Sequence, residues 1–306
     1  MSAPTKLSPR VAFQGEHGAF SEAAAIQLLG EQITTVPRAT FDSAFRAIEE
    51  GAADALLAPV ENSLAGSVVR VYDLLLESNL SIVAETILPI EHHLIGCPGA
   101  KLAELKSVAS HPMALAQCER FFLSHPELKR VPAEDTAGSV RDVLASGDKS
   151  AAGIAGRTAA TRYGGVILAD SIQDNAENFT RFVLLVPGTI EGGPGSSNPA
   201  AHLLIELGVQ QPAQTSTRGM KLSLALRLSH KPGALLAALE PFARHGINLL
   251  KIESRPIHGS PWEYQFFMDV QTDAPAQIEP VLTELKAATS FLRVLGLYPP
   301  APNSTP

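Results

Sequence analysis

The chain has 306 residues, of which 45% are hydrophobic and 18% are charged, and its formal net charge is −7. This length predicts about two domains with sizeable cores, and the apolar content excludes a wholly disordered protein. The acidic balance argues against a dedicated nucleic-acid binder, which would present a basic face. Two cysteines are too few for a disulfide framework or a tetrahedral thiolate site for a metal.

No apolar stretch reaches the roughly 18 residues that a helix needs to span a bilayer. The segment before Arg10 is short and polar, and it has no hydrophobic signal-peptide core. We therefore expect a cytoplasmic protein that binds neither nucleic acid, nor a membrane, nor a metal.

The first part of the chain alternates strand and helix patterns. An apolar strand at Val11–Gln14 runs into a glycine turn, after which Ser21 is expected to cap a helix. A strand-like segment follows at Ile33–Val36, and Thr40 is the expected cap of the next helix. A buried strand at Ala55–Val60 then ends in polar residues. This order is typical of an α/β fold with a mostly parallel sheet.

A second α/β series follows. We expect strands at Leu80–Leu88, Leu94–Cys97, Val108–Ser110, Ala151–Ala155, Val166–Ala169 and Phe179–Val186, and helices from His111 through Phe122, from Asp135 toward Leu144, and at Gly156–Tyr163. In open α/β sheets ligands bind beyond the carboxyl ends of strands. The loops that follow these strands are therefore the expected positions of a site.

The last third of the chain has a different organisation. Residues 188–220 are rich in Gly, Pro and Ser, a composition typical of a linker. The pattern from Lys221 onward predicts a split βαβ unit with the order βαββαβ. We therefore expect a domain at 10–187 made of two α/β subdomains, a linker at 188–220, an α+β domain at 221–299 and a disordered tail at 300–306.

Two early segments carry candidate chemistry. Gly15 and Gly18 precede a helix, so they either cradle an anion or form a tight strand–helix turn. Asn62 and Ser63 follow a buried strand, where they either hydrogen-bond a polar ligand or cap a turn.

Two later segments carry further candidates. Ser110 and Gln117 flank a helix start, and the cysteine after Gln117 is expected to be a buried small hydrophobe. In the strand after Asn178, alternation places Thr180 on one face and Arg181 on the other. Both need partners inside an apolar strand, which a ligand or backbone groups at a sheet edge would supply. His92 and His93 point to opposite faces of a strand, and no site role is assigned to them.

Together these segments resemble the prephenate dehydratase family. The residues that carry the resemblance are Gly15–Glu22, Pro59–Ser63, Ser110–Pro112 with Gln117, and Asn178–Phe182. In the C-terminal part, Gly233-Ala234-Leu235 and Glu253-Ser254-Arg255-Pro256 look like the two effector-site motifs of that family's ACT domain. Their joint occurrence in this order is specific, although each motif alone is weak.

The resemblance implies a fold and a reaction. The fold is α/β, with two subdomains similar to type II periplasmic binding proteins, the substrate in the cleft between them, and a ferredoxin-like ACT domain. The hydro-lyase reaction converts prephenate to phenylpyruvate, water and carbon dioxide in phenylalanine biosynthesis, without a cofactor, and L-phenylalanine inhibits it through the ACT domain.

Two alternatives remain at this stage. Arogenate dehydratases share the architecture. Three segments look like the corresponding sequences of the plant-type arogenate enzymes: Ala114–Glu119, Asp135–Gly138 and Thr289–Gly296. A non-catalytic amino-acid sensor with the same fold is a more remote alternative.

The resemblance also implies roles for individual residues. Thr180 would assist departure of the hydroxyl, Arg181 would meet a substrate carboxylate or hold its strand, and Asn62, Ser110 and Gln117 would be neutral polar ligands. Ser21, Glu61, Ser63 and Phe182 are the expected further substrate contacts. The expected effector residues are Gly233, Ala234, Leu235, Asn248, Glu253, Ser254 and Arg255. Because ACT sites form at symmetric interfaces, we expect a homodimer or a dimer of dimers.

Overall fold

The computed structural model describes residues 8–188, 203, 207, 219–257 and 259–302. Most of the expected linker and the last four residues lie outside this range. The chain divides into two compact units, unit 1 (Met1–Val71 with Ile87–Phe182) and unit 2 (Tyr72–Thr86 with Val183–Pro306). In the part of the chain that the structure describes, no helix is long and apolar enough to cross a membrane.

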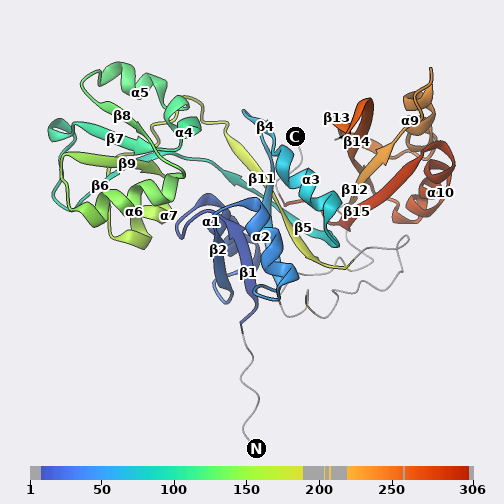
Figure 1. Cartoon of the computed structure of the whole chain (residues 1–306), viewed down its shortest axis with the longest axis horizontal. Helices are drawn as coiled ribbons and strands as arrows, with labels where there is room; N and C mark the ends of the chain where they lie inside the picture. The colour runs from blue at the N-terminus through green and yellow to red at the C-terminus, as the bar shows by residue number, and fades with distance from the viewer. Residues whose placement is uncertain (1–7, 189–202, 204–206, 208–218, 258, 303–306) are drawn as a thin grey trace, which may run out of the picture. The chain divides into compact units, whose positions relative to one another are not determined.

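Unit 1 contains two α/β lobes, drawn in blue and in green in Figure 1. The first lobe has parallel strands in the order β2-β1-β3, with β11 beyond β3, and two helices pack on it. Its elements are β1 (Arg10–Gln14), α1 (Phe20–Leu29), β2 (Thr34–Arg38), α2 (Phe41–Glu49), β3 (Ala55–Asn62), β4 (Gly66–Ser67) and the start of β11 (Phe179–Pro187).

The two expected helix caps in this lobe have different outcomes. Thr40 caps α2, because its hydroxyl accepts from the Ser43 N–H in a reciprocal capping box, as expected. Ser21 does not cap α1, since that helix already begins at Phe20 and Ser21 lies inside its first turn. The carboxylate of Glu22 accepts the Gly18 N–H at 2.6 Å instead, which places a negative charge at the positive end of the helix dipole.

The second lobe is built on a mixed sheet with the strand order β10-β6-β9-β7-β8. Its elements are β6 (His93–Gly96), η1 (Leu102–Glu104), β7 (Ser107–Ser110), α4 (Pro112–Ala116), α5 (Glu119–Ser124), β8 (Lys129–Pro132), α6 (Thr136–Ser146), β9 (Ala151–Ala155), α7 (Arg157–Tyr163) and β10 (Val166–Ala169). Asp135 opens α6 as expected, its side chain accepting from Gly138 N–H.

One helix expected in the second lobe is two helices. The pattern from His111 through Phe122 predicts a single helix, but the structure ends α4 at Ala116 and starts α5 at Glu119. The carboxylate of Asp174 accepts the backbone N–H groups of Glu119 and Arg120, both at 2.9 Å. A residue more than fifty positions away thus supplies the helix start, which local periodicity does not reveal.

Unit 2 holds the βαββαβ arrangement that the sequence predicts. Its antiparallel strands have the order β13-β14-β12-β15. The elements are β12 (Met220–Arg227), α9 (Ala234–Arg244), β13 (Asn248–Ile257), β14 (Ser260–Thr272), η2 (Pro275–Gln277), α10 (Ile278–Ala288) and β15 (Phe291–Tyr298). Leucines of β12 pack with both helices in one apolar core.

Unit 2 also contains residues 72–86, which the sequence expectation assigned to the first domain. They form most of α3 (Val69–Glu77), which the sequence reading missed, and of β5 (Leu80–Pro89). β15 pairs with β5 at Gly296 and Ile82, where a Cβ on Gly296 would lie 2.4 Å from the Ile82 carbonyl oxygen. The guanidinium of Arg293 donates to the carbonyls of Leu76 and Ser78 at 2.8 and 2.7 Å. These contacts attach the α3–β5 segment to the βαββαβ part.

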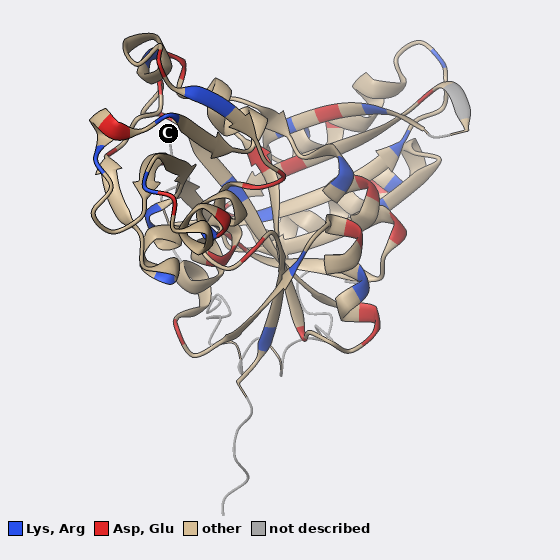
Figure 2. Ribbon diagram, turned by 60° about the vertical axis from the view of Figure 1, so that its left-hand side comes forward, with Lys and Arg blue, Asp and Glu red and all other residues tan. Residues whose placement is uncertain are grey.

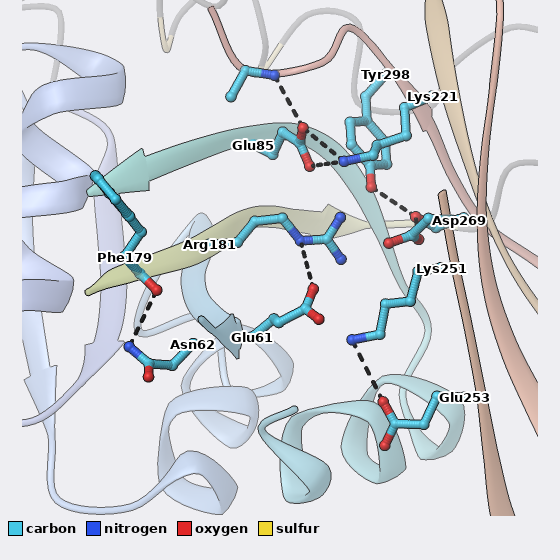
Figure 3. A network of polar contacts seen from close by, with 12 residues as sticks. Glu61, Asn62, Glu85, Phe179, Arg181, Lys221, Lys251, Glu253, Asp269 and Tyr298 are labelled. Carbon is cyan, nitrogen blue, oxygen red and sulfur yellow. Dashed lines mark hydrogen bonds and ion pairs between the residues drawn. The ribbon is translucent and has the colours of Figure 1, made fainter. Parts of the chain in front are cut away.

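Residues of both charges are interspersed along the ribbon (Figure 2). One ion pair differs from the others by its burial. The Lys221 ammonium contacts the Glu85 carboxylate at 2.9 Å, with 6% and 0% of the two side chains exposed (Figure 3). The Ala301 N–H also donates to Glu85, at 3.0 Å. The expected disordered tail is therefore wrong at Ala301, which is 4% exposed because its backbone is hydrogen-bonded inside unit 2.

Removing one partner of this pair should destabilise the protein strongly. We expect Lys221→Met to lower the free energy of unfolding by about 3–5 kcal/mol, because the Glu85 carboxylate loses the ammonium that pairs with it. Lys221→Met/Glu85→Gln should recover most of the loss, since the glutamine oxygen still accepts from Ala301. Urea unfolding followed by circular dichroism measures both. Lys101→Met, at an exposed ion pair, is the control and should change the free energy of unfolding by less than about 1 kcal/mol. If the single and the double variant lose the same free energy of unfolding, the argument is wrong.

Candidate active site

The two lobes of unit 1 contact each other around the Gly15–Gly18 turn. The Thr158 hydroxyl donates to the Gly18 carbonyl at 2.8 Å, and the Tyr163 hydroxyl donates to the His17 carbonyl at 2.7 Å. A Cβ on Gly18, whose φ is +85°, would lie 2.8 Å from the Ala159 Cα. Of the two interpretations of this glycine pair, the structure supports the tight turn, because at Gly18 the backbone of one lobe packs directly against the other.

A cavity of about 560 Å³ opens beside this contact. Residues of both lobes line it: Gln14, Gly15, Ala19, Phe20, Ser21, Ala39, Thr40, Phe41 and Asp42 from the first, and His111, Glu134, Asp135 and Thr136 from the second. Ser21, an expected substrate contact, is on this wall. Asn62 and Thr180 are not among the lining residues.

Asn62 and Thr180 meet where β3 ends and β11 begins. The Asn62 amide nitrogen lies 2.7 Å from Asn178 Oδ1, 2.9 Å from Thr180 Oγ1 and 3.1 Å from the Phe179 carbonyl oxygen; Figure 3 shows it directed at Phe179. A carboxamide nitrogen only donates, so the Thr180 hydroxyl accepts this bond and its own hydrogen is directed elsewhere. The structure thus brings these two expected residues together.

The same network reaches Gln117 and a residue without an expected role. Gln117 Oε1 lies 3.2 Å from Asn178 Nδ2 and 2.9 Å from His92 Nε2. His92 precedes β6 and is 2% exposed, and its ring packs edge-on against Phe20 with centroids 5.7 Å apart. The sequence reading missed His92, because strand alternation gives only the face of a side chain and no partner on another element.

Arg181 and Glu61 lie together on another face. Arg181 Nε is 3.8 Å from Glu61 Oε2, as Figure 3 shows, and Thr180 points to the opposite face of β11 by strand alternation. Ser63 joins the same two strands: its N–H donates to the Phe179 carbonyl at 2.8 Å, and its hydroxyl accepts the Phe179 N–H at 2.9 Å. Arg181, Glu61 and Ser63 therefore fasten β3 to β11.

Two expected contact residues are buried. Ser110 is 0% exposed, and its hydroxyl donates to the Ile154 carbonyl at 2.6 Å across the second sheet. Phe182 is 2% exposed and lies among the largest core side chains. The expectation that both contact a bound molecule does not fit these positions, because each side chain already has its partners in the core.

Burial sets the protonation of the groups around the site. It lowers the pKa of His92, which favours the neutral ring. For Glu22, burial raises the pKa, but hydrogen bonds from Gly18 N–H, Thr35 and His17 outweigh it and leave the pKa below its ordinary value. Burial, with the Asp174 charge, raises the pKa of Cys118 to about 12, so this thiol stays protonated as expected of a small apolar residue. Among the described residues no cluster of His, Cys, Asp and Glu could hold a metal ion.

Unit 2 has a cavity of its own, of about 730 Å³, at the start of α9. It is lined by Leu228, Ser229, His230, Lys231, Pro232, Ala234, Leu235, Glu263, Tyr264, Phe266 and Ser290. Gly233, at φ +81°, is the N-cap of α9 and directs the chain from the lining loop into the helix. Of the expected effector residues, Ala234 and Leu235 lie on this wall.

The other expected effector residues divide between the two faces of β13. Asn248 and Ser254 are on its exposed side. Glu253 and Arg255 alternate with them and are partly buried, Glu253 with Lys251 at 3.4 Å and Arg255 with Asp73 of α3 at 3.4 Å. The neighbouring strand β14 contributes to the cavity: Ser254 of β13 pairs in register with Phe266 of β14, which lines the cavity.

Fold and network together define a two-lobed α/β enzyme with a C-terminal βαββαβ domain. The family model described as Prephenate dehydratase matches residues 11–188, and the model described as ACT domain matches residues 223–288. The chain therefore belongs to the prephenate dehydratase family. It is a prephenate or arogenate dehydratase, a hydro-lyase of phenylalanine biosynthesis, with an ACT domain.

Two of three similar proteins are described as dehydratases of this family, and the third is described as an acylase. An arogenate dehydratase/prephenate dehydratase 1 of Arabidopsis thaliana, described as chloroplastic, is 37% identical and aligns with 95% of this chain and 72% of its own length. A prephenate dehydratase of Arthrobacter aurescens, solved in complex with L-Phe, is 31% identical, with a TM-score of 0.78 over 95% of this chain and 89% of that one. A protein described as GqqA, a novel type of quorum quenching acylase, is 32% identical, with a TM-score of 0.81 over 96% of this chain and 98% of that one.

Acid should destabilise this protein in part through its buried histidines. Burial holds the pKa of both His92 and His93 below the ordinary 6.5. Below about pH 6.5 the unfolded chain therefore binds more protons than the folded chain, and the free energy of unfolding falls as the pH decreases. We expect the thermal midpoint to drop between about pH 7 and about pH 5, and less steeply in His92→Gln. Parallel slopes in the two proteins would exclude His92 as a source of the effect.

Proposed function

We propose that unit 1 dehydrates and decarboxylates prephenate to phenylpyruvate, and that L-phenylalanine binds in unit 2 and inhibits this reaction. The observation that carries the proposal is the bond from Asn62 to Thr180, which leaves the Thr180 hydrogen available to a departing hydroxyl. Arogenate is the alternative substrate of the same site, because three segments of the sequence resemble the plant-type arogenate enzymes.

The reaction balances without a cofactor. In prephenate the bond between the ring and its carboxylate breaks, and its electron pair forms a ring double bond as carbon dioxide leaves. The carbon–oxygen bond to the ring hydroxyl breaks in the same process, and the hydroxyl takes one proton and departs as water. One proton is thus consumed for each phenylpyruvate anion formed. The site has to donate to the leaving oxygen and orient an anion.

Thr180 is the proposed donor to the leaving oxygen. A hydroxyl is a weak acid at neutral pH, so it acts by a positioned hydrogen bond that strengthens as negative charge develops on that oxygen. Gln117 and Asn62 add neutral amide groups. Neutral groups suit a carboxylate that leaves as carbon dioxide, because a firm ion pair would stabilise the ground state more than the transition state. In this proposal Arg181, Glu61 and Ser63 hold the two strands that carry the donors.

Product analysis of the purified protein tests the proposed substrate. The protein is offered prephenate or arogenate separately, each with and without L-phenylalanine. We expect phenylpyruvate from prephenate, at a rate that L-phenylalanine suppresses. Phenylalanine formed chiefly from arogenate would assign the alternative activity to the same site. If the protein turns over neither prephenate nor arogenate but binds phenylalanine tightly, the result would favour a non-catalytic amino-acid sensor.

Thr180→Val tests the proposed donor, because valine keeps the shape of this 8%-exposed side chain and removes its hydroxyl. We expect kcat to fall by about 10²–10³-fold, the size seen when one donor to a developing charge is deleted. Thr180→Ser keeps the hydroxyl and should retain most of the activity. If the valine variant turns over at the wild-type rate, Thr180 has no part in the chemistry.

The cavity of unit 2 suits a zwitterionic amino acid with an aromatic side chain. Lys231 and Glu263 bring opposite charges to its wall, and Tyr264 and Phe266 bring apolar rings. The start of α9 adds backbone N–H groups and the positive end of a helix dipole, which attract a carboxylate. The relative from Arthrobacter aurescens is described as a complex with L-Phe, which supports the same ligand here.

Gly233→Ala should weaken inhibition by L-phenylalanine. An L-residue at φ +81° is strained by about 1–2 kcal/mol, which displaces the chain at the start of α9. Gly246→Ala is the matched control, because Gly246 follows the other end of the same helix at φ +65°, whereas both neighbours of Gly233 line the cavity. We expect the inhibition constant to rise only in Gly233→Ala, with kcat unchanged in the absence of effector. An equal effect of both variants would argue against an effector site at this loop.

We also propose that the βαββαβ domain, at about residues 221–299, forms a homodimer. β13 ends the strand order, and Leu250 and Ile252 on it are 45% and 41% exposed. An edge strand with apolar side chains is a surface that a second copy would cover. The cytoplasmic location stays a prediction.

A further inference from the structure

His92 has a hydrogen bond to Gln117 that neither the fold nor the proposed chemistry explains. Its ring is 2% exposed, and Nε2 lies 2.9 Å from Gln117 Oε1. Which ring nitrogen carries the hydrogen decides whether His92 donates or accepts here. The neighbouring bonds determine that choice.

The deduction starts at Asn62, whose two amide atoms have unambiguous backbone partners. Oδ1 faces the N–H groups of Leu64 and Ala65 at 3.0 and 2.8 Å, and these groups can only donate. The other amide atom faces the Phe179 carbonyl at 3.1 Å, which can only accept. The Asn62 nitrogen therefore points along the network, toward Asn178 and Thr180.

Each following bond then has one possible direction. Because Asn62 donates, the Asn178 atom at 2.7 Å is Oδ1, and Asn178 presents its own nitrogen to Gln117. Because Asn178 donates, the Gln117 atom at 3.2 Å is Oε1. The His92 atom facing that oxygen must then donate, so the hydrogen of the neutral ring is on Nε2.

The surroundings of the ring agree with this tautomer. Nδ1 is buried and has no hydrogen-bond partner among the described residues, so a hydrogen on Nδ1 would be left without an acceptor. Burial lowers the pKa of His92, which keeps the ring neutral. The Gln117 oxygen is occupied by two donors, so its amide hydrogens are directed away from the network.

We propose that His92 is a positioning residue for the dehydration: its Nε2–H holds Gln117 so that the Gln117 amide group and the Thr180 hydroxyl face the substrate as donors. The inference rests on the proposed roles of Thr180 and Gln117. It adds a residue that acts through Gln117 and does not itself touch the reacting atoms.

Two amide substitutions that differ by one methylene test the position of the donor. The amide nitrogen of His92→Gln reaches the position of Nε2, whereas that of His92→Asn does not. We expect His92→Asn to lower kcat about tenfold, the order expected for one lost hydrogen bond, and His92→Gln to stay within about threefold of wild type. His93→Gln is the control for disturbing the same segment of the chain, since the neighbouring His93 ring contacts Asp170 and Ser171 instead. It should leave kcat unchanged.

A double-mutant cycle shows whether the effect passes through Gln117. In a Gln117→Leu background, His92→Asn should change kcat by less than about twofold, because the group that it positions is gone. An undiminished tenfold loss in that background would overturn the proposal, and so would wild-type kcat in His92→Asn itself. Wild-type kcat in Thr180→Val would instead refute the proposed donor.

A measurement that does not depend on turnover completes the test. Two-bond ¹H–¹⁵N correlation spectra of the ¹⁵N-labelled wild-type protein distinguish a protonated from an unprotonated ring nitrogen, and His92→Gln identifies the signals. We expect a protonated Nε2 and an unprotonated Nδ1 at neutral pH. A hydrogen on Nδ1 would reverse the last bond of the network and overturn the inference, whichever substrate the enzyme uses.

Discussion

The side-chain amide of Asn62 connects strands β3 and β11 by hydrogen bonds. The geometry of the rest of the site depends on the partners of this amide group. Its oxygen closes the turn that follows β3, and its nitrogen binds the start of β11. A half-buried carboxamide without these partners would be costly, so one residue holds both strand ends in register. Because Asn62 donates to the Thr180 hydroxyl, this hydroxyl is an acceptor within the protein, and its own hydrogen can be donated to another group.

The strand that carries Thr180, β11, also connects unit 1 to unit 2. Thr180 and Phe182 of β11 belong to unit 1, whereas Val183 begins the part of the strand in unit 2. β5 crosses in the same way between Thr86 and Ile87. In unit 2 the α3–β5 segment is bound by Arg293, by the Lys221–Glu85 pair and by Arg255, which contacts Asp73. Arg255 belongs to the motif expected to bind the effector, so this motif contacts a segment whose chain continues into unit 1.

The sequence predicted much of the fold because its signals are local. Alternating strand and helix patterns gave the two α/β series and the βαββαβ unit, and Thr40 and Asp135 cap helices as expected. The two errors have different causes. Ser21 does not cap α1 because the helix already begins at Phe20 and the neighbouring Glu22 accepts the free N–H of Gly18. The helix after His111 divides because the distant Asp174 starts a new one.

The motifs of the sequence thus determined the family, the order of elements and most residues of the polar network, because residue type and spacing specify strand ends and helix caps directly. Only the tertiary structure separated the residues of the proposed donor network from those that stabilise the strands around it. In the structure Arg181 lies beside Glu61, Ser110 and Phe182 are buried, and His92 is hydrogen-bonded to Gln117. The physical reason is that a hydrogen bond joins atoms on different elements, whose approach depends on packing of the whole unit. A pattern along one strand gives the face of a side chain, but the partner on that face comes from another part of the chain.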